Sequence, residues 1–396
     1  MRFAQAPDSS AAIALLTQIV EGTPATPPPP VETPLVLYGA GKLGVMAAQM
    51  LTRLGRRIEC VLDRQARPGQ FLLDDIPVVH PDTVTPRPDR RIAICVVTSA
   101  FEPIRAALQA AGWTDVIPVY DELERDASLT GMGNGWFAGI LEPAEASAIE
   151  RVLEGWADNH SRAAHLQCLA WRVLRGEWTF DDAPVSIDDR YFIPEVLSAW
   201  QQGEVLVDGG AWHGDALSAY IDRLGERFRS ALALEPDPAN AEILSQHIAT
   251  WPTPLRRRVE LLQAALGDRD TDARFAAGHG LAACLHPDGL AQVRVRTLDT
   301  LDCSPTLLKL HLEGNELAAL KGARDTLRRC RPVVSVTTYH NRDGLYRTPD
   351  WLMTHLPDYR FLMRLHGWCA TGAVVYAIPI ERGSGPTAPT LACPTE

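Results

Sequence analysis

The stretch that most constrains the fold of this chain is Glu204 to Gly214, with the sequence EVLVDGGAWHG. Its apolar run, Val205–Val207, is typical of a strand and delivers Asp208 at its C-terminal end, and small residues follow in a loop. A helical pattern from Ala216 to Leu224 comes next. A strand, a glycine-rich turn and a helix N-terminus together form a nucleotide site, because small residues admit the ligand close to backbone N–H groups. The stretch therefore predicts an α/β domain with a ligand at this loop.

The spacing within the loop indicates which kind of nucleotide it binds. It reads D-x-G-x-x-x-G, from Asp208 through Gly210 and Ala211 to Gly214, and not the G-x-G-x-x-G of dinucleotide sites. An acid already stands at the strand end, and no cluster of amides is aimed at a pyrophosphate. We therefore expect these residues to bind a ligand that has a positive centre and an amino-acid moiety.

A second acid supports this expectation. Ala231–Leu234 is predicted to be the next strand, and it ends on Glu235. A carboxylate about one βαβ unit after the loop can accept both ribose hydroxyls of an adenosine. Charge-assisted bonds of this kind contribute roughly 1.5–3 kcal/mol each. The alternative for either acid, Asp208 or Glu235, is a solvated loop carboxylate.

With the stretches downstream, these residues resemble the FkbM-type family of S-adenosylmethionine-dependent methyltransferases. The segments that carry the resemblance stand in the family's order: VDGGAWHGD, ALEPDPAN, VRVRTLDTL, LKLHLEGNELAALKGA and RPVVSVTTYHN. The most specific part is E-G-x-E followed by K-G-A, placed after T-L-D. Upstream segments look like the N-terminal region of longer members. The resemblance implies a class I methyltransferase fold over residues 185–380, with S-adenosyl-L-methionine as the cofactor.

The rest of this domain alternates strand and helix, as a parallel sheet requires. A third strand is predicted at Val259–Leu262, with Gln263 and Ala264 after it at the adenine edge. The fourth core strand is predicted at Leu307–Leu312 and is followed by a helix over Leu317–Cys330. Three further strands are expected, the last two as an antiparallel hairpin at the sheet edge: Val333–Thr338, Tyr359–Leu365 and Ala373–Ile378.

Methyl transfer from a sulfonium requires the donor and acceptor in line, exclusion of water and removal of a proton from the acceptor. Glu313 and His340, each at the C-terminal end of a predicted strand, are candidates for the general base, and His311 is a third. Related chains have K-x-D-x-E-G where this one has Lys309 to Gly314, so His311 replaces an aspartate. A histidine there is a better base near neutral pH, or it marks lost activity. For each histidine the alternative is a structural role.

Four further residues are expected to contact ligands. Tyr191 stands one helix before the D-x-G strand, where the family has an aromatic pair, and forms either a lid over the cofactor or part of the core. Glu316 faces the same crevice as the other acids. Arg364 and His366 match a basic pair that the family has on the strand before the last one. We expect them to bind an anionic or sugar acceptor.

A second nucleotide-type pattern lies upstream, within residues 34–122. A strand at Leu35–Tyr38 is followed by a complete G-x-G-x-x-G and a helix over Val45–Leu54, and a strand at Ile58–Leu62 then ends on an acid at the ribose position. The residues of this second site are Gly39, Gly41, Gly44 and Asp63. Only one mononucleotide half is present, without the half that would position a nicotinamide. The pattern predicts a small Rossmann-like domain; alternatively, the glycines only permit close packing of helix on strand.

The remaining segments complete the predicted domain organisation. Residues 1–33 contain an amphipathic helix over 9–21 and a proline-rich spacer, and the helix is expected to pack on a neighbouring domain or on a second subunit of a homo-oligomer. Residues 123–184 form a helical linker with helices at Ala144–Asn159 and Arg162–Leu174. Residues 381–396, rich in proline and threonine, are predicted to be disordered. The fold class is thus two Rossmann-like parallel-sheet domains joined by helices.

Composition excludes several classes of protein. A formal net charge of -11 and a pI near 5.5 argue against a nucleic-acid partner, which needs a basic surface. Eight cysteines without C-x-x-C spacing indicate reduced thiols in a cytoplasmic protein and predict no metal site. No apolar run approaches the roughly 18 residues that a membrane span needs, and the N-terminus lacks the pattern of a signal peptide.

The function expected from these patterns is O-methylation of a hydroxyl on a small sugar, a glycan or a secondary metabolite. One alternative is an NAD(P)-dependent oxidoreductase or epimerase that uses the loop from Gly39 to Gly44. The other is a binding protein that keeps the methyltransferase fold but has lost turnover through His311.

Overall fold

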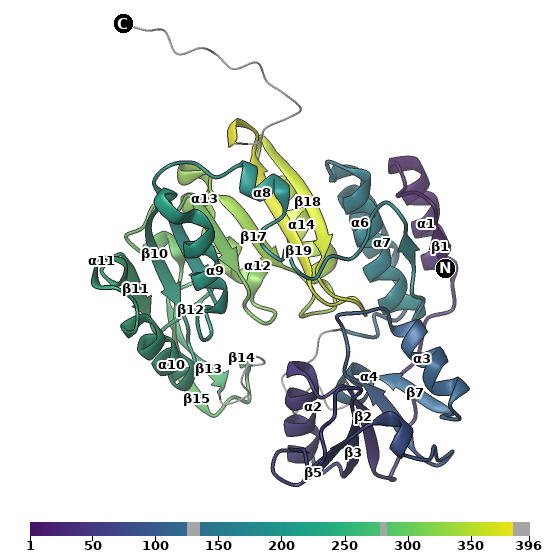
Figure 1. Ribbon diagram of the computed structural model, residues 1–396. Helices are drawn as coiled ribbons and strands as arrows, with labels where there is room; N and C mark the ends of the chain where they lie inside the picture. The colour runs from purple at the N-terminus through teal and green to yellow at the C-terminus, as the bar shows by residue number, and fades with distance from the viewer. Residues whose placement is uncertain (125–134, 278–282, 383–396) are drawn as a thin grey trace, which may run out of the picture.

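The computed structural model of this chain describes residues 1–124, 135–277 and 283–382. The predicted disordered tail therefore lies almost wholly outside the described residues. The described part contains two large sheets, in an N-terminal and a C-terminal domain, and a layer of helices beside them (Figure 1). The cysteines among these residues form no disulfide. None of the helices described is long and apolar enough to span a membrane.

The C-terminal domain is built on a seven-stranded sheet with the order β11-β10-β9-β16-β17-β19-β18. Neighbouring strands are parallel, except that β19 is antiparallel to both β17 and β18. The strands are β9 (Glu204–Gly209), β10 (Phe228–Leu234), β11 (Val259–Leu262), β16 (Leu307–Leu310), β17 (Val333–Thr337), β18 (Tyr359–Leu365) and β19 (Ala373–Pro379). The predicted parallel sheet and its edge hairpin are confirmed.

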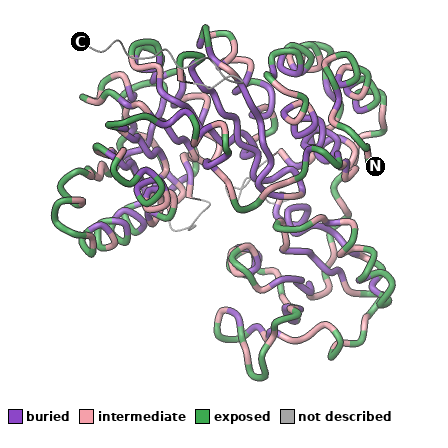
Figure 2. Tube along the Cα trace, turned by 45° about the horizontal axis from the view of Figure 1, so that its top comes forward, coloured by how far each residue is buried: buried purple, intermediate pink, exposed green. Residues whose placement is uncertain are grey.

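Continuous apolar runs form the central strands because both faces of the sheet are covered. Alternate residues point to opposite faces, so Leu307 joins one hydrophobic core and its neighbour Leu308 the other. In Figure 2 much of the tube in the middle of the molecule has the purple of buried residues. The helices of this domain are α8 (Pro194–Ser198), α9 (Asp215–Leu224), α10 (Pro238–Ala249), α11 (Thr253–Arg256), α12 (Glu316–Lys321), α13 (Arg324–Cys330) and α14 (Gly344–His355).

One predicted helix, Leu317–Cys330, is wrong because two helices occupy this segment. The chain breaks between α12 and α13 at Gly322 and Ala323. A Cβ at Gly322 would lie 2.0 Å from the carbonyl oxygen of Gly267, so only glycine fits where the chain passes this close to its neighbour. Gly267 follows the first strand of a small sheet, whose order is β12-β15-β13-β14. Its strands are β12 (Ala265–Leu266), β13 (Thr271–Ala276), β14 (Cys284–Leu285) and β15 (Ala291–Arg296).

The N-terminal domain contains a six-stranded sheet with the order β4-β5-β3-β2-β6-β7. All pairs are parallel except β4 with β5. The strands are β2 (Leu35–Tyr38), β3 (Ile58–Leu62), β4 (Phe71–Leu72), β5 (Ile76–Val79), β6 (Arg91–Ile94) and β7 (Asp115–Pro118), and the helices are α2 (Lys42–Arg53), α3 (Phe101–Ala110) and α4 (Val119–Glu124). The glycine-rich loop joins β2 to α2, as expected for a Rossmann-like domain.

Three helices link the two sheets: α1 (Ser9–Glu21), α6 (Pro143–Gly155) and α7 (Asn159–Leu174). Helix α1 packs on α6 and α7 within the same chain, and α7 packs on the edge strand β18 (Figure 1). A short strand β1 (Arg2–Phe3) pairs with β8 (Thr179–Phe180). The first predicted linker helix is too long, because α6 ends at Gly155 and Asp158 caps α7 by accepting a hydrogen bond from the backbone of Ser161.

Candidate active site

A buried ion pair organises the loop after β9. Asp208 is fully buried, and its Oδ1 lies 2.8 Å from Nζ of Lys309 on the neighbouring strand β16. The same Nζ donates hydrogen bonds to the carbonyl oxygens of Gly209 and Gly210, at 3.3 and 2.8 Å. Asp208 therefore does not hold the loop directly. It fixes Lys309, and Lys309 binds the backbone of the loop.

The glycines of this loop are required by its geometry. Gly210 has a φ of +73°, and a Cβ there would lie 2.0 Å from the carbonyl oxygen of His311. Gly214, with a φ of +91°, is the N-cap residue of α9. Ala211 is buried next to them. The loop thus lies directly against the end of β16, where the candidate bases are.

Glu235 at the end of β10 is fixed by two backbone amides. Its carboxylate accepts hydrogen bonds from the N–H groups of Trp212 and Asp237, at 2.8 and 3.0 Å. Burial raises the pKa of Glu235, and the hydrogen bond from Asp237 opposes this shift. The carboxylate is the acid predicted for the ribose, and it lines a cavity with the loop residues.

This first cavity, which we call the donor cavity, has one polar end and one apolar end. Glu235, Asn240 and Asn315 supply polar groups, and Ala264 lies at the expected adenine edge. Gln263, predicted beside Ala264, is exposed to solvent and does not line the cavity. The apolar side chains that complete the lining are Ala265, Leu266, Phe275, Ala283, Cys284 and Leu285.

A second and larger cavity of about 640 Å³ separates the two domains, and we call it the interdomain cleft. The N-terminal domain contributes Gly39, Gly41 and Asp63, and Lys42 and Thr98 also line it. The C-terminal domain contributes Arg190, His311, Glu313, Tyr339, His340 and His366. His311 and Glu313 line both the donor cavity and the cleft, so the two cavities meet at these side chains.

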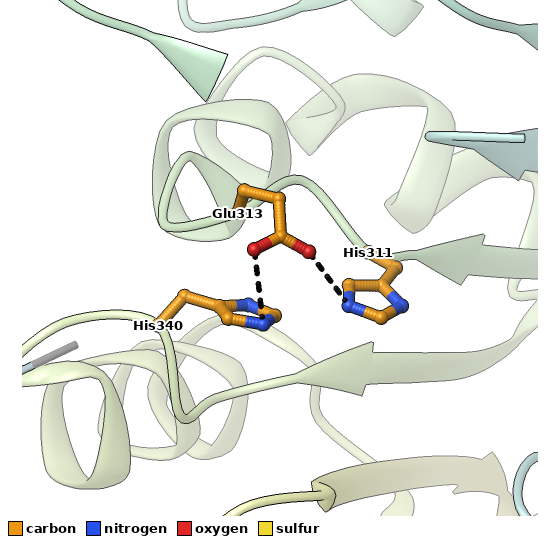
Figure 3. Close-up of side chains that lie close together, drawn as sticks. All are labelled: His311, Glu313 and His340. Carbon is orange, nitrogen blue, oxygen red and sulfur yellow. Dashed lines mark ion pairs between the residues drawn. The ribbon is translucent and has the colours of Figure 1, made fainter. Parts of the chain in front are cut away.

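Three of the predicted catalytic residues converge at this junction (Figure 3). Nε2 of His311 lies 3.0 Å from Oε1 of Glu313, and Nε2 of His340 lies 3.3 Å from Oε2 of the same carboxylate. The two imidazole rings stack, with centroids 4.9 Å apart. Burial, and next the charge of Arg190, lowers the pKa of His311 well below its usual value. Burial raises the pKa of Glu313.

The outer nitrogens of both histidines are also engaged. Nδ1 of His311 lies 2.9 Å from the hydroxyl of Tyr191, which adopts a φ of +70°. Nδ1 of His340 lies 3.3 Å from Oε1 of Glu316. Glu316 also accepts hydrogen bonds from Thr337 and from the backbone of Leu312 and Gly314. Glu316 is not among the described residues that line either cavity. It is instead placed to orient the ring of His340.

The predicted basic pair on β18 is divided between two places. Arg364 is buried away from the cleft and binds Asp158 and Glu195, each at 2.7 Å. His366 lines the cleft, but its ring nitrogens contact the carbonyl oxygen of Ser186 and the hydroxyl of Tyr376, both at 2.8 Å. Burial lowers the pKa of His366 to about 4.

The upstream glycine motif has both packing and surface roles. A Cβ at Gly44 would lie 2.0 Å from the carbonyl oxygen of Gly39, so Gly44 serves the close packing of helix on strand. Gly41 has no atom within 4 Å of an added Cβ and lines the cleft. Asp63 accepts hydrogen bonds from the backbone N–H groups of Ala40 and Gln65, at 2.8 Å each, and so fixes this loop.

The structure also brings together residues that sequence reasoning did not assign to the site. Lys42 of the upstream motif lies 3.5 Å from Asp215 and 5.6 Å from the ring centroid of Trp212. The two glycine-rich loops therefore face each other across the cleft. Arg190 lies over the rings of Tyr191 and Tyr339 and donates to the hydroxyl of Tyr339 at 3.0 Å. Its only sequence signal is its place beside the predicted aromatic pair.

Comparisons with known proteins find a family match over much of the C-terminal domain. Residues 208–364 match the family model described as the methyltransferase FkbM domain. The chain is similar to the crystal structure of methyltransferase FkbM from Methylobacillus flagellatus KT, at 20% identity and a TM-score of 0.62, over 93% of this chain and 98% of that chain. It is also similar to precorrin-6y C5,15-methyltransferase from Geobacter metallireducens GS-15, at 18% identity and a TM-score of 0.29, over 50% of this chain and 95% of that chain. No curated protein matches the chain.

Proposed function

From the match of residues 208–364 to the methyltransferase FkbM domain, we propose that this chain is an S-adenosylmethionine-dependent O-methyltransferase. The proposed acceptor is a hydroxyl group of a sugar, a glycan or a secondary metabolite. The observation that carries the proposal is that His311 and Glu313 line both the donor cavity and the interdomain cleft. A methyl group passed between ligands in these two cavities must cross at these side chains.

The residues of the donor cavity fit S-adenosylmethionine. Glu235 is placed to accept hydrogen bonds from the ribose hydroxyls, and Ala264, Leu266 and Phe275 form an apolar surface for the adenine. Gly210 lines this cavity without a side chain, so the methionine part of the donor can approach the backbone there.

Donor binding must widen this cavity. Its volume is about 80 Å³, below the roughly 300 Å³ at which small-molecule sites begin. The rim on the side of the small sheet consists of Phe275, Cys284 and Leu285, which belong to β13 and β14. We propose that these side chains move outward when the donor binds.

The acceptor is proposed to bind in the interdomain cleft, against the cluster of His311, Glu313 and His340. The oxygen of its hydroxyl forms a bond to the methyl carbon while the bond from that carbon to sulfur breaks. The hydroxyl proton passes to solvent in the cleft, and the products are a methyl ether and S-adenosylhomocysteine. The cluster activates the hydroxyl, and the walls of both domains hold the two reactants in line.

The upstream glycine motif is proposed to form the far wall of the acceptor site. Gly41 and Asp63 line the same cleft as the catalytic cluster. The cleft side of this loop is shared with the catalytic cluster. We therefore favour a role in acceptor binding over an oxidoreductase or epimerase activity for this loop.

The experiment that tests the proposal is methyl transfer from isotopically labelled S-adenosylmethionine. Purified protein is offered panels of free sugars, nucleotide-linked sugars, glycans and hydroxylated metabolites, and products are identified by their gain in mass. We expect at least one methyl ether in the wild type and none in Glu235→Ala. Hydride exchange with a nicotinamide dinucleotide, without methyl transfer to any panel, would contradict the proposal.

A further inference from the structure

We propose that His311, Glu313 and His340 hold a divalent first-row transition cation at the junction of the donor cavity and the interdomain cleft. This inference rests on the proposed methyl transfer and specifies how the cluster activates the acceptor hydroxyl. Two imidazoles and one carboxylate form a ligand set that suits ions such as Zn²⁺, Mn²⁺ or Co²⁺. One ligand atom from each of the three residues lies within 4.8 Å of the others.

The separations between Glu313 and the two histidines are those of ligands that share an ion. Ligands at about 2.0–2.2 Å from a metal, at tetrahedral or right angles, lie about 3.0–3.5 Å from one another. Oε1 of Glu313 lies 3.0 Å from Nε2 of His311, and Oε2 lies 3.3 Å from Nε2 of His340. In Figure 3 both rings turn these nitrogens toward the same carboxylate.

Hydrogen bonding does not account for this contact. Nε2 of His311 is buried and has no hydrogen-bond partner among the described residues, although Oε1 of Glu313 is only 3.0 Å away. The carboxylate oxygen therefore lies off the axis of the ring N–H bond. Two ligands of one ion have this relationship. The ion lies in the ring plane, along the lone pair of Nε2, and the carboxylate binds the ion from another direction.

The outer contacts of both histidines are those of metal ligands. A histidine that binds a metal usually donates its other N–H group to a carboxylate or another oxygen, which fixes the ring. Nδ1 of His340 lies 3.3 Å from Glu316, and Nδ1 of His311 lies 2.9 Å from the hydroxyl of Tyr191. Both Nε2 atoms are thus left to face the ion.

The charge of the site favours a cation. Glu313 and Glu316 bring two carboxylates against His340, and Glu316 is buried. Arg190 is the nearest arginine in the cleft, but in the described part of the chain it forms no ion pair with Glu313 and instead donates to Tyr339. A divalent ion would compensate the negative charge of the two carboxylates and replace the hydration that they lose on burial.

A cation at this junction gives the acceptor hydroxyl a lower pKa. The hydroxyl would bind at a free coordination position on the cleft side and lose its proton to solvent in the cleft. Its oxygen then forms the bond to the methyl carbon as the carbon–sulfur bond breaks, and S-adenosylhomocysteine leaves. His311 and His340 remain ligands throughout and need not accept the proton.

The test is titration of the full-length protein, purified without a histidine tag and treated with chelator, with Zn²⁺ and with Mn²⁺. Isothermal titration calorimetry should give one ion for each wild-type chain. His311→Ala and His340→Ala should each weaken binding at least tenfold, whereas His80→Ala, a half-exposed histidine of the N-terminal domain, should leave it unchanged. His311→Phe keeps a ring at this position and guards against loss of folding, which circular dichroism monitors.

Two further variants sharpen the test. Glu316→Gln should weaken the ion about 10–100-fold through His340, as changes to outer partners do. His311→Asp should shift the preference from Zn²⁺ toward Mg²⁺ and Mn²⁺, because an oxygen ligand replaces nitrogen. Copper bound to the wild type should show nitrogen coupling in its electron paramagnetic resonance spectrum, and this coupling should decrease in His311→Phe.

The outcomes separate this inference from the proposed function. If no ion binds, or if both alanine variants bind it as the wild type does, the metal site is wrong; S-adenosylmethionine binding and chelator-resistant methyl transfer would then leave the proposed function intact. If the ion binds as expected but S-adenosylmethionine does not, the metal site stands and the methyl transfer is wrong.

Discussion

Asp208 and Lys309 lie directly opposite each other on the parallel strands β9 and β16, with 2.8 Å between carboxylate and ammonium and both side chains buried. Removal of one partner would leave the other as an uncompensated buried charge. Lys309→Met should therefore lower the free energy of unfolding by about 3–5 kcal/mol. The double variant Asp208→Val with Lys309→Met should recover much of this loss. Chemical denaturation measures the free energy of unfolding of the single and double variants. A double variant that loses as much stability as the two single variants together would contradict the pairing.

Glu235 offers a test of the donor cavity. Glu235→Ala should weaken S-adenosylmethionine binding by about tenfold or more, because loss of roughly 1.5 kcal/mol corresponds to that factor. Calorimetry measures the affinity directly. Glu242→Ala on the following helix is the matched control, because Glu242 is exposed and its carboxylate accepts a hydrogen bond from the side chain of Gln246. Equal affinities for the two variants would remove Glu235 from the site.

Gly41 distinguishes an acceptor-binding loop from a purely structural one. An added Cβ meets no atom within 4 Å there, so Gly41→Val should fold and bind S-adenosylmethionine as the wild type does. It should raise the KM for the acceptor by about tenfold, a loss of about 1.4 kcal/mol of binding, because the new side chain projects into the cleft. Gly44→Ala, which places a Cβ 2.0 Å from a carbonyl oxygen, should instead lower the melting temperature. Unchanged acceptor kinetics in Gly41→Val would exclude the loop from the acceptor site.

The contact between α6 and the C-terminal domain should depend on pH. The guanidinium of Arg342 lowers the pKa of Glu145 to about 2, from an ordinary 4.5. Because the folded-state pKa is the lower one, the stabilisation is complete above about pH 4.5 and is lost as the pH falls toward 2. Arg342 is 42% exposed, so solvent screening limits the contribution to about 1 kcal/mol.

Glu145→Gln is the variant that measures this contribution. Its free energy of unfolding should be lower than that of the wild type at pH 7, and the difference should shrink steadily below about pH 4.5. A difference that stays constant with pH would mean that the carboxylate charge does not stabilise the contact.

Much of the fold could be predicted because buried parallel strands appear as uninterrupted apolar runs. Residues 35–38, 58–62 and 259–262 were predicted as strands with the bounds that the structure has. The close approach of Gly322 to Gly267, between the two helices, could not be predicted because Gly267 is distant in sequence. The end of α6 had a readable signal, since Asp158 precedes Ser161 at the spacing of a helix cap.

The candidate site was predictable one strand end at a time. His311, Glu313 and His340 follow neighbouring strands, so the rule that ligands bind at the carboxyl ends of parallel strands brought them together. The role of Lys309 as partner of Asp208 requires the register between two strands far apart in sequence. The approach of the upstream loop to the same cluster depends on how α7 packs on β18, and no local pattern contains that information.

The domain after β9 is proposed to bind a methyl donor, and the upstream glycine motif is proposed not to bind a dinucleotide on its own. The most direct test is calorimetric titration of the wild-type protein with S-adenosylmethionine and, separately, with NAD and NADP. We predict binding of S-adenosylmethionine with a dissociation constant of about micromolar, equivalent to about −8 kcal/mol, and no binding of either dinucleotide. Binding of NAD or NADP without S-adenosylmethionine would contradict the account and move the active site to the loop at Gly39.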